Sequence, residues 1–108
     1  MYEKKYFPKK RYKYTLQFLK KHIPNSESIL DLGEYNPFSK IMQDHGYSIK
    51  NTKGEDLDFD TSIIENSNAT VITAFEILEH LLSPFTVLRA IKANRLVVSI
   101  PLRLWFSS

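Results

Sequence analysis

The 108-residue chain contains no cysteine, which excludes disulfide bonds and thiolate metal sites. It also contains no apolar run of the roughly eighteen residues that a membrane span needs, and its first residues are charged rather than signal-like. Both features favour a cytoplasmic protein. The histidines, His22, His45 and His80, show no spacing typical of zinc ligands. The apolar content of 43% and charged content of 25% are ordinary for one globular domain.

Positive charge is concentrated at the N-terminal end. Eight of the fifteen Lys and Arg residues lie in the first 21 positions beside a single acid, Glu3, whereas the rest of the chain is slightly acidic. Residues 1–11 also hold Tyr2, Tyr6 and Phe7, and basic side chains mixed with aromatic ones can hold phosphates and stack on bases. The simpler interpretation is a solvated arm leading into the first helix. We therefore divide the chain into an arm, residues 1–11, and one α/β domain, residues 12–108.

Residues 28–39 have the pattern of a strand, a turn and a helix start. The apolar run at the beginning favours the end of a buried parallel strand, and Gly33 allows a sharp turn after it. Asn36 can cap a helix whose first residue is Pro37. In open α/β sheets such a turn is a ligand site, because unpaired N–H groups and the positive helix end face outward. Asp31 stands at the carboxyl end of the strand, at the rim of the same crevice.

Hydrophobic periodicity places the other elements. It predicts helices and strands in alternation, with helices over residues 12–22, 37–45 and 83–92 and strands over residues 29–32, 47–52, 70–75 and 96–100. In addition, four acids alternate with Leu57 and Phe59 over residues 55–60, which favours one more half-buried strand. The sequence thus predicts an open, mostly parallel α/β sheet of about five strands with helices on both faces.

Three motifs stand at predicted strand ends: Ile-Leu-Asp-Leu-Gly at residues 29–33, Phe-Glu-Ile-Leu-Glu-His at residues 75–80, and Leu-Val-Val-Ser-Ile-Pro at residues 96–101. In order and spacing they resemble class I S-adenosylmethionine-dependent methyltransferases, which have a Rossmann-like fold. The Glu-His pair followed by a Ser-Pro helix start is the most specific of these features. It is typical of the branch that methylates small molecules. The resemblance covers roughly residues 12–101.

The resemblance implies a binding site for S-adenosylmethionine. Asp31 would lie beside the methionine half of the cofactor, and Gly33 and Glu34 would form the loop that approaches it. The ribose hydroxyls would be bound by an acid after the second strand. Glu55 and Asp56, which follow Gly33 by 22 and 23 residues, are the two candidates.

The same resemblance implies roles for four residues farther along the chain. Asp58 would bind the adenine amino group. Phe75, Glu76 and His80 would line the cleft in which a methyl group passes to a small-molecule acceptor. His80 would remove a proton from that acceptor, because an imidazole ordinarily titrates near neutrality.

The chain departs from the family in two places, which keeps a second interpretation open. The first loop has Gly33, Tyr35 and Pro37 where the family usually has three glycines, so a bulky ring is expected where backbone approaches the ligand. The family's last two strands are also expected to be missing. Residues 96–106 would then form an open apolar edge for a second copy or a partner chain. The second interpretation is a non-catalytic interaction or nucleic-acid-binding domain.

Overall fold

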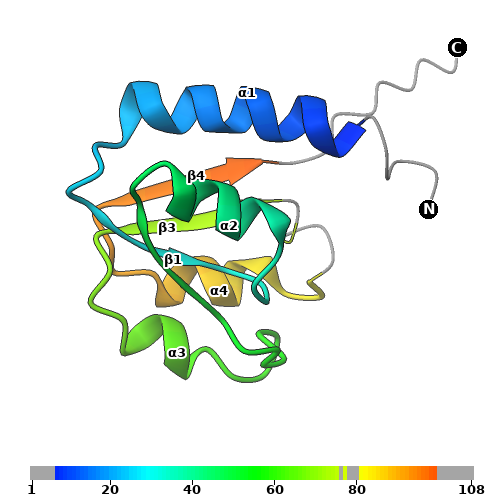
Figure 1. The fold of residues 1–108 in the computed structure, drawn as a ribbon. Coiled ribbons are helices and arrows are strands. Elements are labelled where there is room, and N and C mark those ends of the chain that lie inside the picture. The colour runs from blue at the N-terminus through cyan, green and yellow to red at the C-terminus, as the bar shows by residue number, and fades with distance from the viewer. Residues whose placement is uncertain (1–6, 76, 78–80, 100–108) are drawn as a thin grey trace, which may run out of the picture.

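The computed structural model describes residues 7–75, 77 and 81–99. The elements in chain order are α1 (Phe7–His22), β1 (Ser28–Asp31), α2 (Pro37–Asp44), β2 (Ser48–Asn51), α3 (Ser62–Glu65), β3 (Val71–Phe75), α4 (Pro84–Ala90) and β4 (Arg95–Ser99). Within the described residues the strands form one parallel sheet of four strands in the order β2-β1-β3-β4 (Figure 1). The predicted open α/β sheet flanked by helices is confirmed.

Helices cover both faces of the sheet (Figure 1). Successive strand residues point to opposite faces, so neighbours such as Ile29 and Leu30 enter different clusters. The cluster under α1 and α2 contains Leu19, Ile23, Ile29, Phe38, Met42, Tyr47 and Val71. The cluster under α3 and α4 contains Leu30, Leu32, Leu57, Ile64, Ile72, Ala74, Val87 and Ala90. The chain therefore builds a three-layer sandwich in which a nearly continuous apolar run such as β3 is buried on both sides.

The start of α2 follows the predicted capping pattern. The Asn36 side chain accepts hydrogen bonds from the backbone N–H groups of Phe38 and Ser39 at 2.9 and 3.1 Å. In return the Asn36 N–H donates to Ser39 Oγ at 3.1 Å, which completes a capping box. Gly46 follows the end of the helix with φ of +94°, the left-handed conformation that the sequence predicts for it. Both ends of α2 are therefore set by local sequence.

The predicted strand over residues 55–60 is wrong, and the described part of the sheet has four strands rather than about five. These residues form a turn, in which the Asp56 carbonyl accepts hydrogen bonds from the N–H groups of Phe59 and Asp60, both at 2.9 Å. Leu57 is 3% exposed and Phe59 83% exposed, whereas a strand would place both on one face. The physical cause is local: Asp side chains accept from backbone two residues on, which competes with strand pairing.

Two other boundaries differ from the predicted ones. Helix α1 begins at Phe7, so residues 7–11 of the predicted arm are helical. β4 accounts for Arg95–Ser99, and the remainder of the predicted edge over residues 96–106 lies outside the described residues. Among the described helices, none combines the length and apolar character required to cross a membrane.

Candidate functional site

The sheet changes its direction of growth between β1 and β3. From β1 the chain proceeds to β2 on one side, and from β3 it proceeds to β4 on the other side. In open parallel sheets ligands bind outside the carboxyl ends of the two strands at such a switch point. Asp31 is the last residue of β1 and Phe75 is the last residue of β3, so both stand at this position.

Asp31 lies at the centre of a polar row across three strands. In the parallel register it stands opposite Asn51 on one side and Thr73 on the other. Thr73 Oγ1 donates to Asp31 Oδ1 at 2.7 Å, and Asn51 Nδ2 donates to Asp31 Oδ2 at 3.0 Å. The side chain is only 2% exposed, and this burial raises the pKa of the Asp31 carboxyl from 3.8 to about 6, although the two hydrogen bonds oppose the rise. A cation placed beside the carboxylate would stabilise its charged form.

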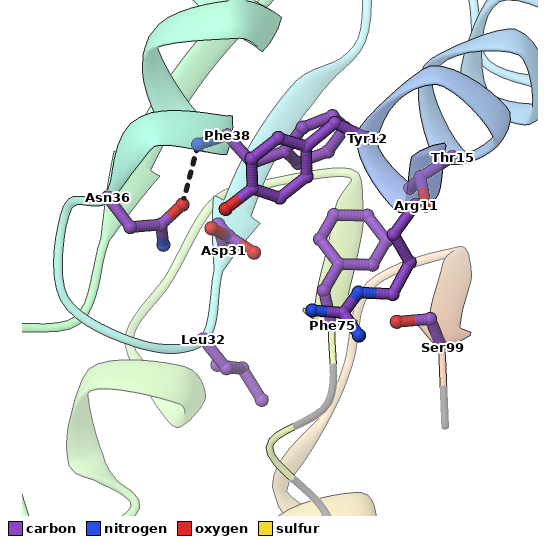
Figure 2. A pocket seen from close by; sticks show the side chains of 9 residues that line it. All are labelled: Arg11, Tyr12, Thr15, Asp31, Leu32, Asn36, Phe38, Phe75 and Ser99. Atoms are coloured by element: carbon purple, nitrogen blue, oxygen red, sulfur yellow. Dashed lines mark hydrogen bonds between the residues drawn. The ribbon is translucent and has the colours of Figure 1, made fainter. Parts of the chain in front are cut away.

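A small cavity opens in front of Asp31 (Figure 2). Its volume is about 150 Å³, and its lining comes from α1, β1, the start of α2, β3 and β4. The lining residues are Arg11, Tyr12, Thr15, Asp31, Leu32, Asn36, Phe38, Phe75 and Ser99. Among the described residues the cavity combines one basic and one acidic side chain, and the Tyr12 hydroxyl points toward the Asp31 carboxylate in Figure 2.

Three aromatic rings form one wall of this cavity. The Tyr12 and Phe38 rings are stacked, with centroids 5.1 Å apart and an interplanar angle of 25°. Phe38 in turn meets Phe75 edge-on, with centroids 5.3 Å apart. Offset-stacked and edge-to-face arrangements are the favoured geometries of aromatic pairs, so the rings stabilise one another in this wall. Phe75 lies in this wall, and its predicted place in a methyl-transfer cleft stays a prediction.

The loop after β1 is tied to the end of β2. The Gly33 N–H donates to Thr52 Oγ1 at 2.7 Å, and the Gly33 carbonyl accepts from Asn51 Nδ2 at 3.0 Å. Gly33 has φ of +121°, a conformation that strains any side-chain-bearing residue, so glycine is needed here for its backbone. Tyr35 does not crowd this turn, because its hydroxyl donates to Gln43 Oε1 of α2 at 2.8 Å.

The loop after β1 also meets the turn after β2, where the predicted ribose-binding acids lie. The Glu34 carboxylate packs so closely on Gly54 that a Cβ there would lie 2.8 Å from Glu34 Oε2. Next to Gly54, Glu55 Oε1 accepts the Lys53 N–H at 2.6 Å. Asp56 is exposed, and its Oδ1 accepts the N–H of Asp58 at 3.1 Å. The fold thus brings Glu34 beside the turn that carries Glu55.

Asp58, the candidate for the adenine amino group, has a structural role that the sequence did not predict. Its carboxylate accepts the backbone N–H groups of Leu82 and Ser83, at 3.0 and 2.8 Å. Ser83 itself makes no side-chain cap on α4, and its hydroxyl instead meets Thr86 Oγ1 at 2.8 Å. Asp58 therefore fixes the chain that enters α4. Its role toward adenine stays a prediction.

Glu76 and His80, the other two predicted cleft residues, lie outside the described residues. Two partners of Asp31, Asn51 and Thr73, were not predicted from the sequence, because only the strand register places them in one row. Arg11 was not predicted as a site residue either: it falls in the predicted arm, and it lines the cavity from α1. A polar threonine inside the apolar run of β3 was the one available signal.

Comparison of the chain with protein-family models, with curated proteins and with solved structures finds no match. In the described part of the chain no three metal-ligating side chains gather in a group that could hold a metal ion.

Proposed function

We propose that the chain binds S-adenosylmethionine at the carboxyl ends of β1 and β3 and acts as the cofactor-binding part of a methyltransferase with a Rossmann-like fold. One observation carries this proposal: a buried carboxyl, Asp31, shares a small cavity at the switch point of the sheet with a basic side chain, Arg11. The sequence motifs at residues 29–33, 75–80 and 96–101 also favour S-adenosylmethionine as the cofactor.

The charges of the cavity suit the methionine half of the cofactor. Its ammonium would bind the Asp31 carboxylate and favour the charged form of that buried acid. Its carboxylate would face the positively charged Arg11 guanidinium, a group of the kind that binds carboxylates in proteins. The sulfonium would lie beside the three aromatic rings that line the cavity, and aromatic rings attract cations. A volume of about 150 Å³ suits the amino-acid half alone.

The adenosine half would then lie outside the cavity, over the loops that follow β1 and β2. These loops are joined by the hydrogen bonds of Gly33 and by the contact of Glu34 with Gly54. Glu55 or Asp56 would bind the ribose hydroxyls, which donate well to carboxylates. Asp58 would reach adenine only in competition with the two amides it already accepts.

Transfer of the methyl group to a small oxygen or carbon acceptor is the proposed reaction. The cofactor supplies an electrophilic methyl group, and the chain holds donor and acceptor in line, an arrangement that accounts for much of such rate enhancements. Phe75 would pack against the reacting groups from β3. Glu76 and His80 would act at the acceptor side, with His80 taking the acceptor's proton.

A ligand series tests the proposal. Because a ligand that binds only the folded state at a hundredfold excess over its Kd adds about 2.7 kcal/mol of stability, S-adenosylmethionine is expected to raise Tm by about 10 °C. S-adenosylhomocysteine, which keeps the amino-acid half, is expected to do the same, and adenosine alone to do much less. A Tm unchanged by millimolar S-adenosylmethionine would contradict the proposal.

A further inference from the structure

Helix α1 has an inner face and an outer face of different chemistry. The inner face packs on the sheet through Leu19 and the following Ile23, which are 0% and 3% exposed, with Tyr12 and Leu16 beside them. The outer face is solvent-exposed and carries Lys10, Lys13, Tyr14, Gln17, Phe18, Lys20 and Lys21. No acidic residue occurs in the helix, whose sequence is FPKKRYKYTLQFLKKH. The basic charge of the outer face is therefore not neutralised by acids of its own helix.

Two aromatic rings stand among these lysines. Tyr14 is 63% exposed and Phe18 49% exposed. Their spacing of four residues places them as neighbours on one stripe of the helix. Phe18 packs against His22, with ring centroids 4.4 Å apart, and about half of its surface remains exposed to solvent. Aromatic side chains stabilise a fold most when they are buried. A pair of them exposed on a basic face therefore points to a binding surface.

The surface continues into a groove between the second half of α1 and β4. Its volume is about 560 Å³, and Phe18, His22, Arg95 and Leu96 are among its lining residues. Leu96 is 39% exposed. Arg95, another lining residue, donates from Nη1 to the His22 carbonyl at 2.8 Å, which ties the guanidinium to the end of α1. A guanidinium has five N–H donors, and this is one bond. Basic groups thus flank an apolar floor.

We propose that the outer face of α1 and this groove bind a single-stranded nucleic acid. Lys10, Lys13 and Lys21 contact phosphates, Tyr14 and Phe18 stack on bases, and Arg95 holds the strand at the groove. A single strand is required because the bases of a duplex are stacked inside it and cannot reach the rings. A lipid surface fits less well, because the continuous apolar face that such a helix would insert is already buried against the sheet.

This surface is separate from the proposed cofactor cavity. The cavity uses Arg11, Tyr12 and Thr15 from α1, whereas the nucleic acid uses the exposed residues of the outer face. The two proposals therefore rest on different residues, and each has its own test.

The test is fluorescence anisotropy of the whole chain with a labelled single-stranded RNA of mixed sequence, and with the corresponding DNA. The double variant Tyr14→Ala, Phe18→Ala is expected to weaken binding at least tenfold, since stacking on one aromatic ring contributes about 1–3 kcal/mol per base. The conservative pair Tyr14→Phe, Phe18→Tyr is expected to retain wild-type affinity, because both rings remain. Because both side chains are exposed, the substitutions are expected to leave Tm unchanged. The measured Tm then verifies that the fold is intact.

The lysines are tested by the salt dependence. Lys13→Gln with Lys21→Gln is expected to lower the slope of log K against log salt by about 1.4, because each phosphate contact of a single strand contributes about 0.7. The matched control is Lys50→Gln with Lys53→Gln. Lys50 stands opposite Leu30 in the β1–β2 register and shares its face of the sheet, away from α1. This control is expected to bind as the wild type does.

Three results would overturn the proposal. The first is no binding of either oligonucleotide at 50 mM salt. The second is a greater loss in the Lys50/Lys53 control than in the Lys13/Lys21 variant, which would place the nucleic acid on the other face. The third is binding to phosphatidylserine vesicles without binding to oligonucleotides, which would make the surface a lipid site. The Tyr14/Phe18 variant should still bind S-adenosylmethionine, so failure here leaves the cofactor proposal to its own test.

Discussion

Asp31 is a carboxyl group whose burial makes its ionisation unfavourable. Its pKa of about 6 in the folded chain exceeds the value of 3.8 in the unfolded chain. Between these two pH values the native state holds a proton that the unfolded state has already lost. The stabilising contribution is therefore complete below about pH 4 and is lost as pH rises to about 6, in total about 3 kcal/mol. A cationic ligand beside the carboxylate would offset this loss of stability.

Replacing Asp31 by asparagine is expected to stabilise the protein above pH 6 when no ligand is added. An amide keeps both hydrogen bonds, accepting from Asn51 and donating to Thr73 Oγ1, without a buried charge. Urea denaturation from pH 4 to pH 8 is the measurement. Asp31→Asn should be more stable than wild type by about 2 kcal/mol at pH 7.5, and this difference should disappear toward pH 4. An Asp31→Asn variant less stable than wild type at pH 7.5 would show that the carboxylate is well compensated.

Ligand affinity should follow the same titration. The ammonium of the ligand's amino-acid half remains protonated below about pH 7.5. Of this ammonium and the Asp31 carboxyl, only the carboxyl therefore changes charge between pH 5 and 7. Affinity for S-adenosylmethionine is expected to rise up to tenfold per pH unit below about pH 6 and to level off above it. Calorimetric titrations at pH 5, 6 and 7 measure this. An affinity independent of pH over that interval would separate Asp31 from the ligand.

At the scale of elements, α2 depends on its cap, because eight residues are too few for a helix that forms without support. Asn36→Ala removes the acceptor for the N–H groups of Phe38 and Ser39 and is expected to lower the free energy of unfolding by about 1 kcal/mol. Thermal or urea denaturation measures the loss. The matched change at an exposed loop position, Asn68→Ala, should leave stability within about 0.5 kcal/mol. Equal effects of the two changes would argue against the capping role.

The entry to α4 depends on Asp58. Asp58→Ala leaves the N–H groups of Leu82 and Ser83 without their acceptor, and we expect a loss of about 1–2 kcal/mol in unfolding free energy. Asp56→Ala, which removes an exposed carboxylate with one local contact, is the control and should lose less. If Asp58→Ala lowers affinity for S-adenosylmethionine and adenosine without loss of stability, Asp58 is an adenine ligand instead of an anchor.

Helices and strands whose limits are set by neighbouring residues could be predicted from the sequence. A segment whose side chains bond its own backbone could not, because these bonds compete with strand pairing. The boundaries of α2 follow from Asn36, Pro37 and Gly46, and β3 follows from a β-branched run. The turn at residues 55–60 has the alternation of a strand, yet Asp56 and Asp60 close hydrogen bonds with backbone two residues on. Alternation records which residues are apolar. It does not show which backbone N–H groups already have hydrogen-bond partners in nearby side chains.

At the scale of the whole molecule, the site is made by register and packing across the chain. Asp31 could be named from its place after an apolar run, but Asn51 and Thr73 reach it only because three parallel strands align them. The cavity is closed by α1, whose Arg11 and Tyr12 are separated from β1 by the rest of the helix and a loop. No local pattern in the sequence encodes that contact, which is why the sequence indicated the strand end and missed the cavity.

The most direct test of the cofactor site is calorimetric titration of S-adenosylmethionine into the purified chain at pH 7.5, with Asp31→Asn and Asp44→Asn measured beside it. Asp44 is an exposed acid paired with Lys40, so its variant controls for the loss of one negative charge. We expect micromolar binding by the wild type and by Asp44→Asn, and a loss of at least a hundredfold in Asp31→Asn, whose fold is intact. Wild-type binding that survives Asp31→Asn, or no binding at millimolar cofactor, would contradict the proposed site.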